Sequence, residues 1–466
     1  MSDGPERYQN LPAPGPFSDD ERVRDLGDGL VLRRATEADV DALVEFNRVA
    51  QADPPDFRPD NHIAVWTREL MDGSHPTMCA RDFLLVDDTA RKRVASTLCL
   101  VSHQFRYDGI PLSAGQVEIV GTHPDYRRRG LVRAQMEVVH GWSAGRGQRM
   151  QVIDGIPWYY RQFGYEMALE VHGGRLVHRA RLAAGVETGD PTDGVRVRDA
   201  REDDAGLLVR AYAKLRARSR LSCDHDEAFC AYEIARWTDG AGSLRERRFG
   251  VIEDERGTPL GILSRYPIVL QGWLLVAMLE IEEGVAWPRV LPAVWAELDR
   301  VGRSLAADGP DDSEFAGAFL RLGSDHPVYA AAPDRVRDVR EPYAYYVRVP
   351  DLPGFLQHVA PALEQRLAAS PLSGTSGMVT LSLYRSGVRF VLEAGRFAVL
   401  ESWQPSTAEP GHARIPDLVF LQLLLGFRSL EELEAAFPDC VVQHDLARSL
   451  LQAWFPKQVS QLVLTD

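Results

Sequence analysis

The sequence predicts a mixed α/β fold, with two tandem mixed-sheet domains followed by a smaller α+β domain. Three observations lead to this fold class: the chain has 466 residues, a strand–helix pattern occurs twice, and a different pattern follows. At about 150 residues per domain, the length alone suggests about three domains. Hydrophobic residues make up 45% and charged residues 26%, which excludes a disordered chain, a collagen and a coiled-coil rod.

Composition also limits the partners and the compartment. The formal net charge of −14 repels nucleic acid and favours cations such as amines. The five cysteines show no metal-ligand spacing, so we expect neither a metal site nor disulfides. The longest apolar run, 418–427, is too short to span a bilayer, and no signal-peptide pattern occurs. We therefore expect a cytoplasmic protein with no membrane partner.

Regular structure is expected from Gly29 onward, after a Pro-, Asp- and Gly-rich tail over residues 1–27. Residues 30–32 form a short apolar strand. Thr36 and Asp39 then make a variant of the capping box, which predicts the start of a helix. Apolar residues at helical spacing continue this helix beyond Asp39.

The same pattern returns later in the chain. DGLVLRRATEADVDALV at 28–44 aligns without gaps to DGVRVRDAREDDAGLLV at 193–209. Two more pairs follow in the same order: RDFLLVDD at 81–88 with RRFGVIED at 247–254, and VEIV at 117–120 with LEIE at 279–282. Three similarities in one order favour two copies of one α/β domain over a chance likeness between strand–helix starts.

A third pattern begins near Pro350. The expected elements are a helix at 352–368, strands at 379–384, 388–393 and 396–403, an apolar core helix within 416–427, and an amphipathic helix within 446–455. The chain is therefore divided into a tail and three predicted domains: 1–27, 28–185, 193–349 and 350–466.

The strongest chemical pattern lies between a β-rich run ending near Thr122 and a helix beginning near Gly130. The first amides of a helix and its dipole bind phosphate, and a glycine allows close approach of the anion. Four arginines crowd this turn and would repel one another without an anion: Arg127, Arg128, Arg129 and Arg133. In an acidic chain we favour a phosphate site over a solvated basic loop.

Arg127-x-x-Gly130-x-Val132 resembles the [Gln/Arg]-x-x-Gly-x-[Gly/Ala] signature of GNAT N-acetyltransferases, which binds the pyrophosphate of acetyl-CoA. Val132 departs from the usual small residue and narrows the space at the turn. The resemblance implies acetyl-CoA as co-substrate and no metal. The implied phosphate-binding residues are Arg127, Arg128, Arg129, Gly130, Leu131, Val132 and Arg133.

A second motif supports this resemblance. RMQVIDG at 149–155 predicts a buried strand, and PWYYRQFGYE at 157–166 predicts a short helix. In GNAT enzymes this unit closes the cofactor cleft, and its helix carries a tyrosine that protonates the departing thiolate. Tyr160 falls on that position, and a phenol with a pKa near 10 suits the role. Packing is the alternative role for Tyr160 and is expected for the neighbouring tyrosines.

The resemblance also implies how the thioester is held. In this fold, amides at the end of the fourth strand polarise the carbonyl, and spacing from the turn assigns this to Val120 and Thr122, with Gly121 between them. Gly155 and Ile156 are expected to contact the cofactor. The acetyl group then passes directly to a deprotonated amine, without an acyl-enzyme.

The general base is left open. Glu118 lies on the fourth strand, and period two places residues 118, 120 and 122 on one face. An ion-pair role for Glu118 is an equal alternative. Some GNAT enzymes carry the glutamate slightly earlier, where this chain has Gln116. His123, beside the turn, could relay protons or be merely solvated.

The second copy lacks these features. Glu282 and Glu283 would repel a pyrophosphate, and Trp287–Pro288 take the place of the turn. Tyr329 is kept without the surrounding Phe-Gly-Tyr pattern. We expect this copy not to bind CoA but to form a wall of the substrate cavity.

The combination of an active copy, a degenerate copy and a third domain resembles the Eis-like (enhanced intracellular survival) acetyltransferases. GFRSLEELEAAFPDC at 426–440 and LLQAWFPK at 450–457 resemble their third domain, which is similar to sterol carrier protein. In that group the C-terminal carboxylate acts as base, a role that would fall here to Asp466. Many relatives assemble as trimers or hexamers.

The sequence therefore predicts an acetyl-CoA-dependent N-acetyltransferase that acts on a primary amine of a cationic acceptor. The resemblance implies an aminoglycoside-like small molecule, a polyamine or a lysine side chain. The alternative is a non-catalytic CoA-responsive or lipid-binding protein that works through the sterol-carrier-like domain.

Overall fold

The computed structural model describes residues 24–52, 61–182, 194–236, 247–308 and 314–464. Two compact units divide the chain: Met1–Leu169 with Ala344–Gln458, and Glu170–Tyr343 with Val459–Asp466. Three sheets with helices packed on them form these units, and parallel and antiparallel strand pairs both occur. The predicted mixed α/β fold class is confirmed.

The first unit contains a sheet with the order β1-β2-β3-β4-β5-β6-β16-β7. Its strands are β1 (Arg24–Gly27), β2 (Leu30–Arg34), β3 (Phe83–Asp88), β4 (Arg93–Tyr107), β5 (Ile110–Thr122), β6 (Met150–Ile153), β7 (Glu166–Val171) and β16 (Tyr343–Arg348). Thus β16, far away in sequence, lies between β6 and β7. The segment expected to be a tail already contributes β1, which pairs with β2.

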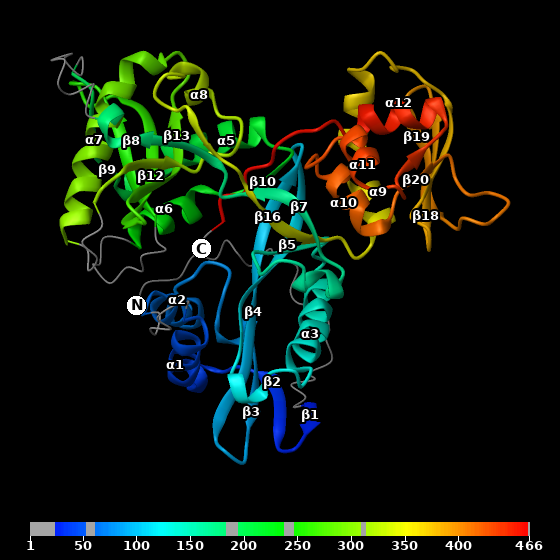
Figure 1. The fold of residues 1–466 in the computed structure, drawn as a ribbon, viewed down its shortest axis with the longest axis horizontal. Coiled ribbons are helices and arrows are strands. Elements are labelled where there is room, and N and C mark those ends of the chain that lie inside the picture. Colours follow the sequence, from blue (N-terminus) through cyan, green and yellow to red (C-terminus); the bar gives the residue numbers. More distant parts are fainter. Residues whose placement is uncertain (1–23, 53–60, 183–193, 237–246, 309–313, 465–466) are drawn as a thin grey trace. The chain divides into compact units, whose positions relative to one another are not determined.

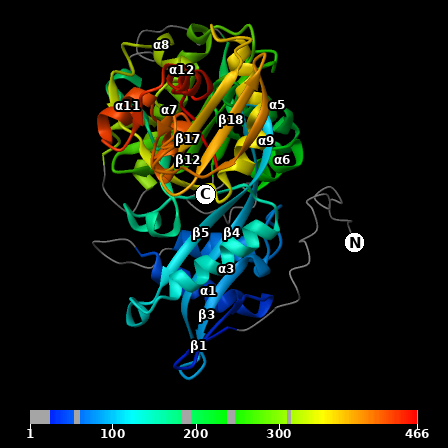
Figure 2. The ribbon, with the colours of Figure 1, turned by 90° about the vertical axis from the view of Figure 1, so that its right-hand side faces the viewer.

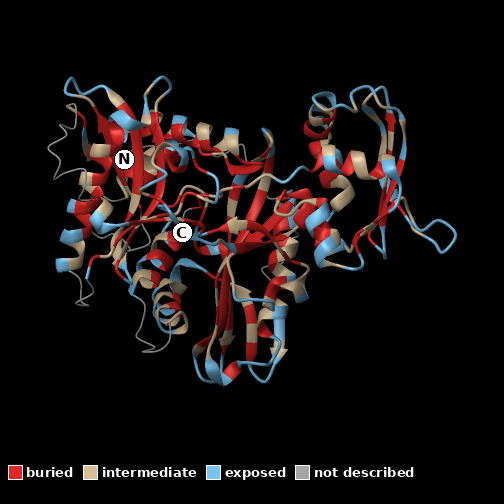
Figure 3. Ribbon diagram, turned by 45° about the horizontal axis from the view of Figure 1, so that its top comes forward, coloured by how far each residue is buried: buried red, intermediate tan, exposed pale blue. Residues whose placement is uncertain are grey.

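Helices cover both faces of this sheet, as Figure 1 shows on either side of β4. They are α1 (Val40–Ala50), α2 (Asn61–Met71) and α3 (Leu131–Gly145). Side chains alternate along each strand, so Leu98 and Leu100 join the core that includes Leu131, while Cys99 joins the core that includes Leu43. Burial on both faces explains why β4 and β5 are largely apolar and appear red in Figure 3.

An ion-pair triad ties the start of α1 to the sheet. Thr36 and Asp39 form the predicted capping box. Arg33 bridges Asp39 and Asp87, with N–O distances of 2.6 and 2.7 Å. The Arg33 guanidinium lowers the pKa of Asp39 to about 2.

The second unit contains a sheet with the order β15-β8-β14-β13-β12-β11-β9. Its strands are β8 (Gly174–His178), β9 (Arg196–Asp199), β11 (Arg248–Glu253), β12 (Pro259–Leu270), β13 (Trp273–Ile281), β14 (Gly317–Leu320) and β15 (Asp338–Arg340). The other elements are β10 (Leu221–Cys223), α5 (Ala205–Arg218), α6 (Glu227–Ala235), α7 (Trp287–Asp308) and α8 (Pro327–Ala331).

The triad of the first unit occurs again in the second. Arg198 bridges Asp204 and Glu253 at 2.7 and 2.8 Å. The segments that resemble each other in sequence therefore place the same ion pairs at corresponding points of the two sheets.

A third sheet, within the first unit, has the order β19-β18-β17-β20-β21, and β17 and β18 can be followed in orange in Figure 2. Its elements are α9 (Leu352–Ala368), β17 (Gly377–Ser382), β18 (Gly387–Glu393), β19 (Arg396–Trp403), β20 (Ala413–Arg414), α10 (Asp417–Leu424), α11 (Leu430–Ala436), β21 (Val441–Val442) and α12 (Asp445–Trp454). The predicted helices and strands are present. Helix α11 was not predicted, although Ser429 and Glu432 form its capping box.

Within the described ranges, every helix is too short or too polar to cross a lipid bilayer.

Half-buried His140 predicts a pH dependence of stability. Its Nε2 lies 2.9 Å from the Tyr165 hydroxyl, and burial lowers the pKa of His140 to about 4. The unfolded imidazole titrates near 6.5, so the unfolded chain binds more protons between pH 4 and 6.5. Stability is therefore greatest above pH 6.5 and falls as the pH drops. Between pH 7 and 5 this residue should account for a loss of about 2 kcal/mol.

Urea unfolding of the native protein and of His140→Gln, at pH 7 and pH 5, measures this effect. Other buried histidines act in the same direction, so the difference between the two proteins is the informative quantity. An equal loss of stability in both would show that His140 does not titrate as its burial requires.

Candidate active site

A β-bulge interrupts β5 at the residues expected to polarise the thioester. The register with β4 shifts between Glu118 and Gly121, so that Ile119 and Val120 together face one residue of β4. Ile119 has a φ of 51°, a region that β-branched residues rarely adopt. Bulges of this kind reorient backbone and side chains and are common beside active sites.

The bulge corrects one expectation from the sequence. Regular alternation would put residues 118, 120 and 122 on one face, but the extra residue reverses the faces beyond it. Glu118 and Gly121 share the face covered by α1, and Gly121 lies against that helix. Thr122 faces α3. Its hydroxyl lies 2.9 Å from the Ser96 hydroxyl, which also donates a hydrogen bond to Gln135 of α3.

β5 and β6 part just before the bulge. Their parallel register joins Ala114–Gln116 to Met150–Val152, while β5 continues to Thr122. In the described sheet, the last residues of β5 therefore have a strand partner on one side only. Gln51 Nε2 donates a 3.0 Å hydrogen bond to the carbonyl of Val120, which ties the bulge to the end of α1. Backbone groups on the open side of β5 can polarise a bound carbonyl.

The predicted phosphate-binding turn leads from β5 into α3. Helix α3 begins at Leu131, with Gly130 as its N-cap at a φ of 78°. Arg128 also has a positive φ, of 63°. Val132 packs against the core beside α3. The helix start and its glycine thus lie as the motif predicts, with the first amides of α3 at the turn.

The four arginines of the turn fall into two pairs. Arg129 forms a 2.7 Å ion pair with Asp28, and Arg133 donates a 2.7 Å hydrogen bond to Gln162. The side chains of Arg127 and Arg128 are exposed and form no hydrogen bond or ion pair with any residue that the structure describes. Two guanidinium groups are thereby available to an anion, and two are held in place by the protein.

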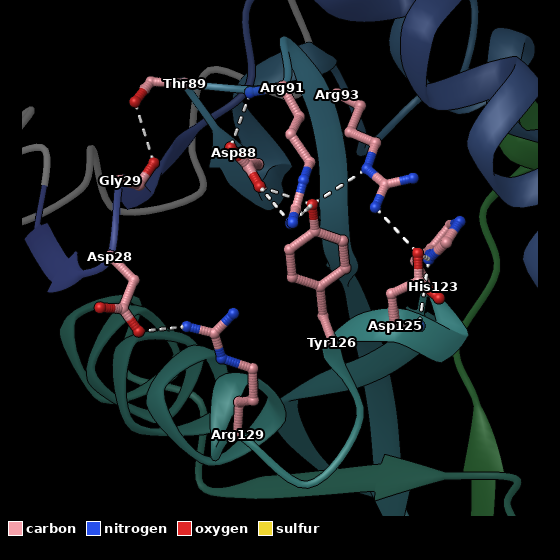
Figure 4. Close-up of polar contacts among 10 residues, drawn as sticks. All are labelled: Asp28, Gly29, Asp88, Thr89, Arg91, Arg93, His123, Asp125, Tyr126 and Arg129. Atoms are coloured by element: carbon pink, nitrogen blue, oxygen red, sulfur yellow. Dashed lines mark hydrogen bonds and ion pairs between the residues drawn. The ribbon is translucent and has the colours of Figure 1, made fainter.

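Tyr126 anchors the turn in the sheet, as Figure 4 shows. It is 1% exposed; its hydroxyl donates to Asp88 Oδ2 at 2.5 Å and accepts from Arg93 Nε at 2.9 Å. The Arg129 guanidinium lies 5.9 Å from the centre of its ring. His123 Nδ1 accepts a hydrogen bond from the backbone N–H of Asp125, so His123 caps the short helix containing Tyr126.

Tyr160 lies on a short 3₁₀ helix, Tyr159–Phe163, after β6. The phenol is 6% exposed, and its ring packs directly on Gly155, where a Cβ would lie 2.1 Å from a ring carbon. Tyr346 of β16 packs edge-on at 5.6 Å. Among the described residues the Tyr160 hydroxyl has no hydrogen-bond partner. Burial, together with the charge of Glu118, raises the pKa of Tyr160, so it stays a proton donor at neutral pH.

The neighbours of Tyr160 pack around it. Tyr159 contacts its ring edge-on at 5.1 Å, and Tyr165 is fully buried. Ile156, expected at the cofactor, has an exposed side chain, and its carbonyl accepts a hydrogen bond from Tyr346. Tyr165 and Tyr346 have hydrogen-bond partners, whereas the hydroxyls of Tyr159 and Tyr160 have none among the described residues.

Glu118 is half-buried and accepts a 2.6 Å hydrogen bond from Gln116 Nε2. Its charge acts on Tyr160, so the predicted base and acid influence each other electrostatically. Asp466, the other carboxylate predicted at the site, lies outside the described residues. The last described segment, 459–464, packs in the second unit, where Ser460 accepts a hydrogen bond from the backbone of Leu221.

The corresponding groups of the second unit are bonded internally. Glu280, which aligns with Glu118, is paired with Arg218 and lies 3.4 Å from His326. The Tyr329 hydroxyl donates to the carbonyl of Gly323 at 3.0 Å. The register of β13 with β12 is regular from Met278 to Ile281, and its shifts lie earlier in the strand, between Leu274 and Met278.

Comparison with known proteins gives the class. Residues 31–168 match the acetyltransferase (GNAT) domain family, and no curated protein matches the chain. Similar solved structures include a probable N-acyltransferase from Enterococcus faecalis, 12% identical with a TM-score of 0.65, covering 93% of this chain and 98% of that one. A GCN5-related N-acetyltransferase from Kribbella flavida is 19% identical with a TM-score of 0.59, covering 93% and 99%. Eis1 from Mycobacterium abscessus is 18% identical with a TM-score of 0.53, covering 93% and 99%.

At such identities the solved structures show a shared fold, while the family match carries the chemistry. Residues 31–168 form a GNAT acetyltransferase domain, and the protein is an N-acetyltransferase. The predicted resemblance to GNAT enzymes is thereby confirmed. Enzymes with this domain use acetyl-CoA as co-substrate. Over the ranges that the structure describes, no three His, Cys, Asp or Glu side chains are grouped to hold a metal ion.

Arg128→Glu should weaken acetyl-CoA binding by about 100-fold or more, because it removes a charge-assisted contact and adds repulsion at the phosphate. Isothermal titration calorimetry measures this affinity. Arg385→Glu, at an exposed arginine in the hairpin between β17 and β18, is a matched control that should keep the native affinity. Unchanged binding in Arg128→Glu would remove the turn from the cofactor site.

Proposed function

We propose that the protein transfers the acetyl group of acetyl-CoA directly to a primary amine of a cationic acceptor. One observation carries this proposal: the buried Tyr160 has no hydroxyl partner among the described residues and lies within the electrostatic influence of Glu118. In the second unit, by contrast, Tyr329 and Glu280 are already bonded to the protein. We assign the acid to Tyr160 and the base to Glu118.

Each part of the site has a role in this reaction. Arg127 and Arg128, with the first amides of α3, bind the pyrophosphate. The Gly155 backbone admits the Tyr160 ring and shapes the same site. Backbone groups from Val120 to Thr122 polarise the thioester carbonyl. Acetyl-CoA supplies an activated acetyl group with a thiolate as leaving group.

Three proton transfers complete the reaction. Glu118 takes a proton from the acceptor ammonium, and the amine nitrogen then forms a bond to the carbonyl carbon as the C–S bond breaks. The second proton that this nitrogen must lose to become an amide passes to water. Tyr160 donates its proton to the departing sulfur. Asp466 is a second candidate for the base.

The acceptor class follows from charge. A protein with a net charge of −14 attracts polyamines, aminoglycoside-like compounds and lysine side chains. The wider assignment is an Eis-like, cytoplasmic enzyme that assembles as a trimer or hexamer. The shared triads of Arg33 and Arg198 support a degenerate second GNAT copy. The order of α9, the hairpin strands and α12 supports a sterol-carrier-like third part.

Thiol release from acetyl-CoA should depend on an amine when aminoglycosides, polyamines, lysine peptides and arylalkylamines are tested. With the active amine, Tyr160→Phe should lower kcat by about 100-fold and leave acetyl-CoA affinity within twofold, since the phenol acts in the transition state. A thiol-release assay gives kcat, and isothermal titration calorimetry gives the affinity for acetyl-CoA. Acetyl-CoA binding without release for any amine would contradict the proposed acceptor class, and an unchanged kcat would move the acid elsewhere.

A further inference from the structure

We propose that Gln116 is a positioning residue that holds Glu118 as the general base, and that His103 fixes the orientation of the Gln116 amide. This inference rests on the proposed function, in which Glu118 accepts the proton of the acceptor. It assigns roles to two residues that flank the reaction without touching the substrate.

The three side chains form one continuous chain of hydrogen bonds. His103 Nε2 lies 2.6 Å from Gln116 Oε1, and Gln116 Nε2 lies 2.6 Å from Glu118 Oε1. Gln116 pairs with Val101, and Glu118 pairs with Cys99. Because alternate residues share a face, His103, two residues beyond Val101, lies diagonally opposite Gln116 on that face.

The chemistry of the amide fixes the direction of each bond. A carboxylate can only accept, so the atom of Gln116 that meets Glu118 must be the donor Nε2. The remaining amide atom, Oε1, is an acceptor, and His103 must therefore present Nε2–H to it. A flipped amide would bring two acceptors together at Glu118. The imidazole donor at the far end prevents this flip.

Burial makes this arrangement rigid. Gln116 is fully buried and His103 is 6% exposed, so any unsatisfied amide or imidazole atom would carry a large desolvation cost. Phe105 stacks on the His103 ring, with centroids 5.6 Å apart and planes within 16°. The chain therefore begins at a ring with a fixed position and ends at the half-buried carboxylate.

This chain transmits orientation and does not conduct protons. A neutral amide has no proton that it can pass on while accepting another, so it cannot act as a relay between His103 and Glu118. Its effect is to fix the rotamer of a flexible glutamate beside the bulge at Ile119. Holding a base in its reactive geometry lowers the entropic part of the barrier.

The second unit lacks this device. The position of Gln116 is taken by Met278, which has no amide, and Glu280 is held instead by Arg218 and His326. The two units thus treat the equivalent glutamate in opposite ways. In the first unit a neutral amide donor contacts the glutamate, and in the second an arginine pairs with it.

Gln116→Leu should lower kcat by about 10-fold, with acetyl-CoA affinity and the KM for acetyl-CoA within twofold. His103→Leu should lower kcat several-fold, and His103→Gln, which keeps a donor, should restore most of the loss. The double variant Gln116→Leu/Glu118→Gln should be no slower than Glu118→Gln alone, because Gln116 acts through that carboxylate. Steady-state kinetics on the folded, full-length variants give these values.

Gln151→Leu is the matched control. Gln151 is a fully buried glutamine on β6 whose Nε2 donates to Ser143 at 2.7 Å, away from Glu118. This variant should lose stability without losing kcat. If Gln116→Leu does not fold, the comparison between His103→Leu and His103→Gln decides. Additive losses in the double variant, or equal kcat values for both His103 variants, would overturn the positioning role. If Glu118→Gln alone still lowers kcat while the positioning role fails, Glu118 remains the base and the proposed function stands.

Discussion

The parting of β5 from β6, next to a bulge at Ile119, is the constraint on which the site depends. Parallel pairing stops at Gln116, and an extra residue then turns the strand. One edge of β5 is thereby left without a strand partner in the described sheet, and Glu118, before the bulge, faces the opposite side of the sheet from Thr122. The bulge is a strained feature that α1 holds through Gln51. Strain of this kind persists when neighbouring structure supports it.

The two sheets share an ion-pair triad and satisfy their other polar groups differently. Both place an arginine–carboxylate triad at the same point, because that triad fixes a strand and a helix start. They differ in how their polar groups are satisfied. In the first unit, the phenol of Tyr160 and two arginines of the turn have no partner among the described residues. In the second, Glu280 pairs with Arg218 and the Tyr329 hydroxyl donates to the carbonyl of Gly323.

Local features were predictable from the sequence, and features set by register were not. The capping box at Thr36 and the helix start at Gly130 depend on a few adjacent residues. The Tyr160 helix follows from a local motif in the same way. The bulge depends on how β5 pairs with β4, so regular alternation gave the wrong face for Thr122. The link from His103 to Gln116 likewise requires the strand register. Helix α11 could have been found, since Ser429 and Glu432 form a recognisable cap.

The position of β16 in the sheet limits how the gene of this protein can be divided. That strand, which follows β8 to β15 of the second unit in the sequence, lies between β6 and β7 of the first sheet. A gene shortened after codon 185 would specify an acetyltransferase sheet with a strand missing from its interior. The strands of the first sheet are therefore not encoded by one uninterrupted stretch of the gene. A complete first sheet therefore requires the chain to continue past most of the second unit, as far as β16.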